Sequence, residues 1–90
     1  MVQMDELVSE AKWQDVVDGF ALAPRQADIT RLLLQGCGDK QIARNLGITV
    51  PTVRTHLSRM FARLKVEGRS ELILRVLLRI RGMDGPAAVC

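Results

Sequence analysis

The 90-residue sequence has no tyrosine, one histidine, two cysteines and only three aromatic residues. With so few aromatic side chains, the core must be built from aliphatic residues. The scarcity of tyrosine and threonine, beside many arginine, glutamate, glutamine and alanine residues, favours helices over strands. The short length leaves room for one domain. We therefore predict a single all-α domain.

The sequence also lacks the residue patterns of metal sites and of most enzymes. Cys37 and Cys90 do not form a CxxC pair, and one histidine cannot complete a usual zinc site. No Ser/His/Asp, Cys/His or paired-carboxylate arrangement stands out. We therefore expect no metal ion, no cofactor and no enzymatic activity.

Long apolar runs are absent too. No run approaches the roughly 20 residues that a membrane helix needs, so we expect no membrane partner. Arg75 and Arg79 interrupt the most apolar stretch, residues 72–80. Two free thiols and the lack of a signal peptide predict a reducing cytoplasm.

Charge is distributed unevenly along the chain. Residues 1–20 contain five acidic residues and one lysine, whereas residues 21–90 contain twelve lysines or arginines and five acidic residues. A basic segment of this kind indicates a polyanionic partner such as nucleic acid, although a solvated basic face is the alternative.

Apolar spacing and helix-breaking residues predict five helices, at about 5–18, 24–36, 39–47, 49–64 and 70–81. The first could instead be a fragment of a linker. Asp39 is an N-cap or a first-turn acid, Thr49 is a good N-cap, and Ser70 can cap the last helix. We divide the chain into an N-terminal helix or linker (1–20), a domain of four helices (21–82) and a flexible tail (83–90).

The third and fourth predicted helices form a helix-turn-helix unit. The turn Leu46-Gly47-Ile48 separates them, and its glycine permits the positive φ that a tight reversal needs. Ala43 is small where the two backbones must approach. The longer helix can then project its outer face into a major groove.

That outer face has a single sign of charge. No acidic residue occurs between Thr49 and Lys65, whereas a merely solvated helix usually mixes signs. The absence of acids fits docking onto phosphates. The face comprises Thr52, Arg54, Thr55, Ser58, Arg59, Ala62 and Arg63.

The motifs LxPRQ, QIARNLGIT, TVRTHLSRMFARL and GRSEL, within residues 22–80, resemble the LuxR-type (GerE-type) helix-turn-helix domain of bacterial transcription regulators. The resemblance implies a four-helix domain, here preceded by a short N-terminal helix. It implies a regulator in the bacterial nucleoid that binds double-stranded DNA as a dimer, with the helix at about 49–64 in the major groove and the last helix at the dimer interface.

The same resemblance implies roles for individual residues. Arginine can donate two hydrogen bonds to guanine, and a threonine methyl can contact a thymine methyl. The candidates for base reading are Arg54, Thr55 and Ser58. The candidates for phosphate contacts are Lys40, Thr49, Thr52, His56, Arg59 and Arg63.

The chain departs from the family pattern at several positions outside the proposed reading face. Ala23 stands where serine or threonine is usual, which weakens the first cap. Gln26 and Gln41 replace glutamates, and Gly38 replaces a common serine. Lys65 replaces the usual glycine after the third helix of the domain, so the end of that helix is uncertain from sequence.

The last helix is apolar on more than one side. Leu74, Leu77 and Leu78 cannot all face one core, because consecutive helical residues are turned by about 100°. These three residues are our candidates for a homodimer interface. The alternative is that the N-terminal helix covers the surplus apolar face.

The sequence also fits two other functions. Region 4 of sigma factors has a similar helix-turn-helix, although THLSRMFARL and GRSEL favour the LuxR type. The fold could also serve as a protein-interaction module that has lost DNA binding. RNA polymerase is a further candidate partner of a regulator.

Overall fold

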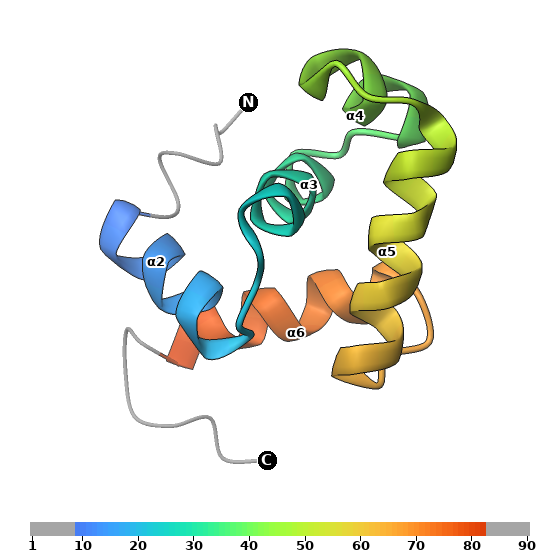
Figure 1. Cartoon of the computed structure of the whole chain (residues 1–90). Coiled ribbons are helices and arrows are strands. Elements are labelled where there is room, and N and C mark those ends of the chain that lie inside the picture. The colour runs from blue at the N-terminus through green and yellow to red at the C-terminus, as the bar shows by residue number, and fades with distance from the viewer. Residues whose placement is uncertain (1–8, 83–90) are drawn as a thin grey trace.

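The computed structural model describes residues 9–82, and this part contains five helices and no strand. They are α2 (Glu10–Gly19), α3 (Pro24–Leu34), α4 (Asp39–Leu46), α5 (Val50–Leu64) and α6 (Arg69–Gly82). In Figure 1, α3 lies in the middle, with α4, α5 and α6 packed around it, and α2 packs on α6. The all-α fold is confirmed. The predicted tail lies outside the described residues, and the division at 20/21 and 82/83 stays a prediction.

A single aliphatic core joins all five helices. Each helix contributes buried apolar side chains, and those of α5, Val53, Leu57 and Met60, recur at i, i+4 and i+7. Thr30 is the only buried polar residue of the described part, and its hydroxyl donates to the Gln26 carbonyl at 2.8 Å. Cys37 is a half-buried free thiol against this core. No helix within residues 9–82 is long and apolar enough to cross a membrane.

Helix α2 begins at Glu10, and the predicted start at Asp5 lies outside the described residues. Ser9 has an extended backbone (φ −69°, ψ 163°), and its hydroxyl accepts a hydrogen bond from the Lys12 amide, so Ser9 is the N-cap of α2. A continuous helix from Asp5 was therefore wrong, because an N-cap residue leaves the helical conformation. Trp13 and Val16 of α2 are buried in the common core, so α2 packs as part of it. The choice between an N-terminal helix of the domain and an ordered fragment of a linker stays a prediction.

Ion pairs tie the start and the middle of α2 to other helices. Asp15 accepts a hydrogen bond from Arg79 of α6 at 2.7 Å, and Glu10 accepts one from Arg31 of α3 at 3.1 Å. The hydrogen bond and charge of Arg79 lower the pKa of Asp15 below its ordinary value. These bonds hold α2 against α3 and α6.

The turn between α4 and α5 has the predicted geometry. Gly47 ends α4 with φ 68° and ψ 33°, in the left-handed region. Thr49 is the N-cap of α5, and its hydroxyl accepts a hydrogen bond from the Thr52 amide at 3.3 Å. A reversal of three residues therefore sets the direction of α5 relative to α4.

Three helix starts differ in detail from the family pattern or from our prediction. Gly38 is the N-cap of α4, which makes Asp39 the first-turn acid. Ala23 has no side chain that could cap α3, but Gln26 accepts a hydrogen bond from its amide. Ser70 does not cap the last helix: the helical hydrogen bonds start at the Gly68 carbonyl, and α6 begins at Arg69.

The end of α5, left uncertain by the sequence, lies at Leu64. Lys65 follows with φ 58° and ψ 45°, the left-handed conformation that usually requires glycine. A residue with a Cβ atom is strained there by about 1–2 kcal/mol. The lysine therefore performs the function of the usual glycine at an energetic cost.

We predict that Lys65→Gly raises the free energy of unfolding by about 0.5–1 kcal/mol, since relief of the strain exceeds the added entropy of the unfolded chain. Urea denaturation followed by circular dichroism measures the change. Gly47→Ala, which introduces a Cβ at φ 68°, is the matched control and should destabilise. A destabilised Lys65→Gly variant would contradict the prediction.

Candidate nucleic-acid interface

The outer face of α5 is open to solvent along its length. All seven residues assigned to it from the sequence are exposed, while Val53, Leu57 and Met60 point into the core. Arg54, Thr55 and Ser58 occur at i, i+1 and i+4 and therefore lie on one side of the helix. Thr52, Arg59 and Arg63 lie on the flank beside them. The exposed face thus has a stripe of base-reading candidates next to a stripe of phosphate candidates.

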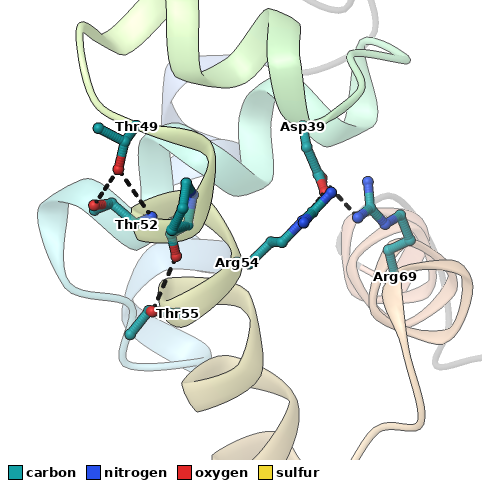
Figure 2. A network of polar contacts seen from close by, with 7 residues as sticks. Asp39, Thr49, Thr52, Arg54, Thr55 and Arg69 are labelled. Atoms are coloured by element: carbon teal, nitrogen blue, oxygen red, sulfur yellow. Dashed lines mark hydrogen bonds and ion pairs between the residues drawn. The ribbon is translucent and has the colours of Figure 1, made fainter.

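Hydroxyl groups at the start of α5 are bonded to one another and to the backbone. The Thr49 and Thr52 hydroxyl oxygens are 2.8 Å apart, and the Thr55 hydroxyl donates to the Pro51 carbonyl at 3.0 Å (Figure 2). Because the single proton of the Thr55 hydroxyl is used there, its methyl group and its two oxygen lone pairs are what it can offer to a base.

The tertiary structure brings an acid to this face that the sequence of α5 does not contain. Asp39 of α4 accepts a hydrogen bond from Arg54 Nε at 3.0 Å and one from Arg69 Nη2 at 2.6 Å (Figure 2). The Asp39 side chain is 14% exposed and that of Arg54 is 68% exposed.

Sequence reasoning did not predict that Asp39 bonds Arg54, or that Arg69 bonds the same carboxylate. A signal existed for Arg69, because it is the first residue of α6. The positive end of a helix dipole disfavours a cation there unless an anion is near.

Arg63 is engaged within the protein, at the far end of α5. Its guanidinium donates to the Ala21 carbonyl and to Gln26 Oε1. It borders, with Arg59, a hollow of about 620 Å³ between the end of α2 and the start of α3. Arginine has five donor hydrogens, so a phosphate contact by Arg63 would use those that remain.

The other phosphate candidates occur on two helices. Lys40 is exposed in the first turn of α4, and His56 is half-buried on α5. Among residues 9–82, no group of three or more His, Cys, Asp or Glu side chains could hold a metal ion.

The three leucines proposed for a dimer interface all lie outside the core. Leu74, Leu77 and Leu78 are 54%, 45% and 47% exposed, whereas Leu72, Val76 and Ile80 bury the other side of α6. Since α2 packs on α6 without covering these leucines, the alternative that the N-terminal helix hides them is wrong for the described part of that segment.

Electrostatics favour a charged Asp39. Partial burial raises the pKa of its carboxyl, but the hydrogen bonds and charges of Arg54 and Arg69 outweigh this effect and hold the pKa below its ordinary value. The carboxylate is therefore ionised at neutral pH and remains a hydrogen-bond acceptor for both arginines.

Comparison with known proteins identifies the fold. Residues 21–76 match the family described as bacterial regulatory proteins, luxR family. The chain belongs to this luxR family. The matched residues form the domain that this family of bacterial regulatory proteins shares, and the named relatives are described as transcription regulators. The resemblance found in the sequence is thus confirmed.

Named relatives support the same assignment. The chain is 44% identical over 50 residues to the nitrate/nitrite response regulator protein NarL of Escherichia coli, covering 56% of this chain and 23% of NarL. It is 39% identical over 54 residues to the monoamine regulon transcriptional regulator of Klebsiella aerogenes, covering 60% and 24%.

A third relative is the putative HTH-type transcriptional regulator YhjB of Escherichia coli, 36% identical over 58 residues, covering 64% of this chain and 29% of YhjB. The chain therefore spans about a quarter of the length of these relatives. No solved structure matched it.

We predict that the Asp39 carboxyl titrates below the ordinary aspartate value of about 3.9, as measured by carbon-detected NMR. Arg69→Gln should raise this pKa. Because the unfolded chain has the ordinary value, Asp39 adds stability above that pH and loses its contribution as the pH falls through the lower folded pKa.

Asp39→Asn should accordingly weaken the dependence of unfolding free energy on pH in the acid range, whereas Asp28→Asn, at an exposed position of α3, serves as the control. An Asp39 titration that neither Arg54→Ala nor Arg69→Gln alters would contradict this account.

Proposed function

We propose that the protein binds double-stranded DNA sequence-specifically as a symmetric homodimer, with α5 in the major groove. The observation that carries the proposal is the exposed outer face of α5, which presents Arg54, Arg59 and Arg63 without an acidic residue of its own. The width of a major groove accepts one α-helix. RNA polymerase would be the partner on which such a regulator acts at a promoter.

The proposed role of each side chain follows from its position on α5 or beside it. Arg54, Thr55 and Ser58 are proposed to read base edges. Thr49, Thr52, His56, Arg59 and Arg63, together with Lys40 of α4, are proposed to contact phosphates on the flanks and to set the register of α5 in the groove. Selection of binding sites from random DNA tests the proposal, and an inverted repeat is the expected product.

The dimer is proposed from the exposed leucines of α6. Three large apolar side chains at i, i+3 and i+4 form one surface stripe, and the same stripe on a second copy is self-complementary about a two-fold axis. A dimer of this kind would place two α5 helices symmetrically on DNA.

A protein-interaction module is the second candidate function, and the same leucine stripe favours it. A module that has lost DNA contacts would bind random DNA without the steep salt dependence that phosphate contacts produce. The salt slope on random DNA therefore separates the two functions.

We predict that Arg54→Ala weakens binding to the selected site by roughly 1–3 kcal/mol and relaxes specificity at one base position, because it removes a bidentate contact to guanine. Competition binding to single-base variants measures both effects. Arg59→Ala is the matched control on the same helix. Equal weakening on specific and random DNA would reduce Arg54 to a phosphate contact.

Arg59→Ala and Lys40→Ala should weaken binding to all sequences alike. Each lost phosphate contact should also lower the slope of log K against log salt by about one unit. Filter binding at several salt concentrations gives the slope. If neither substitution changes it, α5 does not dock in the orientation proposed.

Leu77→Asp should give a folded monomer, because the side chain lies outside the core. Analytical ultracentrifugation measures the mass, and affinity should fall about tenfold or more on the inverted repeat but not on a half-site. Val76→Asp, at a fully buried position of the same helix, is the control that should unfold. A wild-type protein that stays monomeric at high concentration and on DNA would exclude this dimer.

A further inference from the structure

Asp39 connects three helices at the edge of the proposed DNA-reading face. It is the first residue of α4, and its carboxylate lies between Arg54 of α5 and Arg69 of α6 (Figure 2). Each arginine uses a different carboxylate oxygen: Arg54 Nε lies 3.0 Å from Oδ2, and Arg69 Nη2 lies 2.6 Å from Oδ1. The carboxylate is thus held at both oxygens.

The way in which Arg54 is held leaves its outer end available. Only Nε donates to Asp39, and within residues 9–82 no hydrogen bond is formed by its Nη1 or Nη2. The side chain is 68% exposed. Two parallel N–H donors are what bidentate recognition of guanine O6 and N7 requires, and the two terminal amino groups of Arg54 supply them.

The role of Arg69 is to hold Asp39 in place and to balance its charge. An acid beside DNA would repel phosphates if it were not neutralised. With two arginines around one carboxylate, the cluster keeps a net charge of +1 at neutral pH. The carboxylate can therefore direct Arg54 without making this edge of the surface repulsive to DNA.

An arginine without such an anchor has many rotamers, and it can reach phosphates as well as bases. Fixing it at Nε restricts these rotamers before DNA arrives, so less conformational entropy is lost when the guanine contact forms. The restriction favours one geometry and therefore one base. It acts on discrimination between sequences more than on overall affinity.

We propose that Asp39 is a positioning residue for base recognition: it anchors Arg54 through Nε and presents the two amino groups of that arginine to guanine in the major groove. This inference rests on the proposed base-reading role of Arg54. The opposite possibility is that Asp39 competes with DNA for Arg54. Competition would engage the terminal amino groups, whereas the bond observed leaves them unused.

The experiment compares wild type with Asp39→Ala, Asp39→Asn, Arg54→Ala and the double variant Asp39→Ala/Arg54→Ala. Affinity is measured at one salt concentration on the selected site, on its single-base variants and on random DNA. Asp28→Ala is the matched control, since it removes an acid from α3 without touching Arg54. Thermal unfolding checks that each variant is folded.

Asp39→Ala should reduce the guanine preference at the Arg54 position by about threefold to tenfold, a part of the discrimination that a bidentate arginine–guanine pair supplies. Asp39→Asn should lose less, because its amide oxygen still accepts from Nε. Affinity for random DNA should stay equal or rise. In the Arg54→Ala background, the Asp39 substitution should have no further effect on base preference.

Full retention of the guanine preference by Asp39→Ala, with raised affinity on all DNA, would overturn the proposal in favour of competition. If Arg54→Ala itself leaves every base preference intact, the base-reading role of Arg54 fails first. The two failures are therefore distinguishable. Should Asp39→Ala not fold, Asp39→Ser, which is too short to reach Arg54 and can still occupy a helix N-terminus, gives the same readout.

Discussion

The reversal at Gly47 is the constraint on which the exposed face of α5 depends. With φ 68° at this glycine and Thr49 as the N-cap, α5 leaves α4 in one direction only, and burial of Ile42, Val53 and Leu57 holds it there. A change in the angle between α4 and α5 would turn core residues of α5 toward solvent. The positions of the proposed base-reading side chains therefore follow from a turn and a core to which they do not themselves belong.

Helix α6 carries the proposed dimer surface and also contacts the edge of the proposed DNA-reading face. One side of it is buried through Leu72, Val76 and Ile80. Its first residue, Arg69, reaches the Asp39–Arg54 cluster, and Arg79 near its end holds α2. The remaining side is the exposed leucine stripe. A single helix thus links the proposed dimer surface to the edge of the recognition helix.

Sequence rules based on helix periodicity succeeded where a feature depends on neighbouring residues alone. The sequence predicted the outer face of α5, which is exposed, while Val53, Leu57 and Met60 are buried on the opposite side, because a helix repeats every 3.6 residues. The rules were less reliable at helix ends. Ser9 is the N-cap of α2, whereas the sequence predicts a helix that runs through it, and Gly68 precedes the first residue of α6, whereas the sequence favours Ser70 as its cap. In both cases several nearby residues suit a cap, and packing decides which one is used.

The sequence by itself determined the helical class, the helix-turn-helix unit and the family, because periodicity, turn glycines and short motifs are local properties of the chain. It also determined which residues of α5 are exposed. Only the tertiary structure decided what surrounds them. Asp39, Arg54 and Arg69 lie 15 residues or more apart in the chain, and no periodicity relates them. They meet because the core orients three helices around one point, and such a meeting depends on the packing of the whole chain.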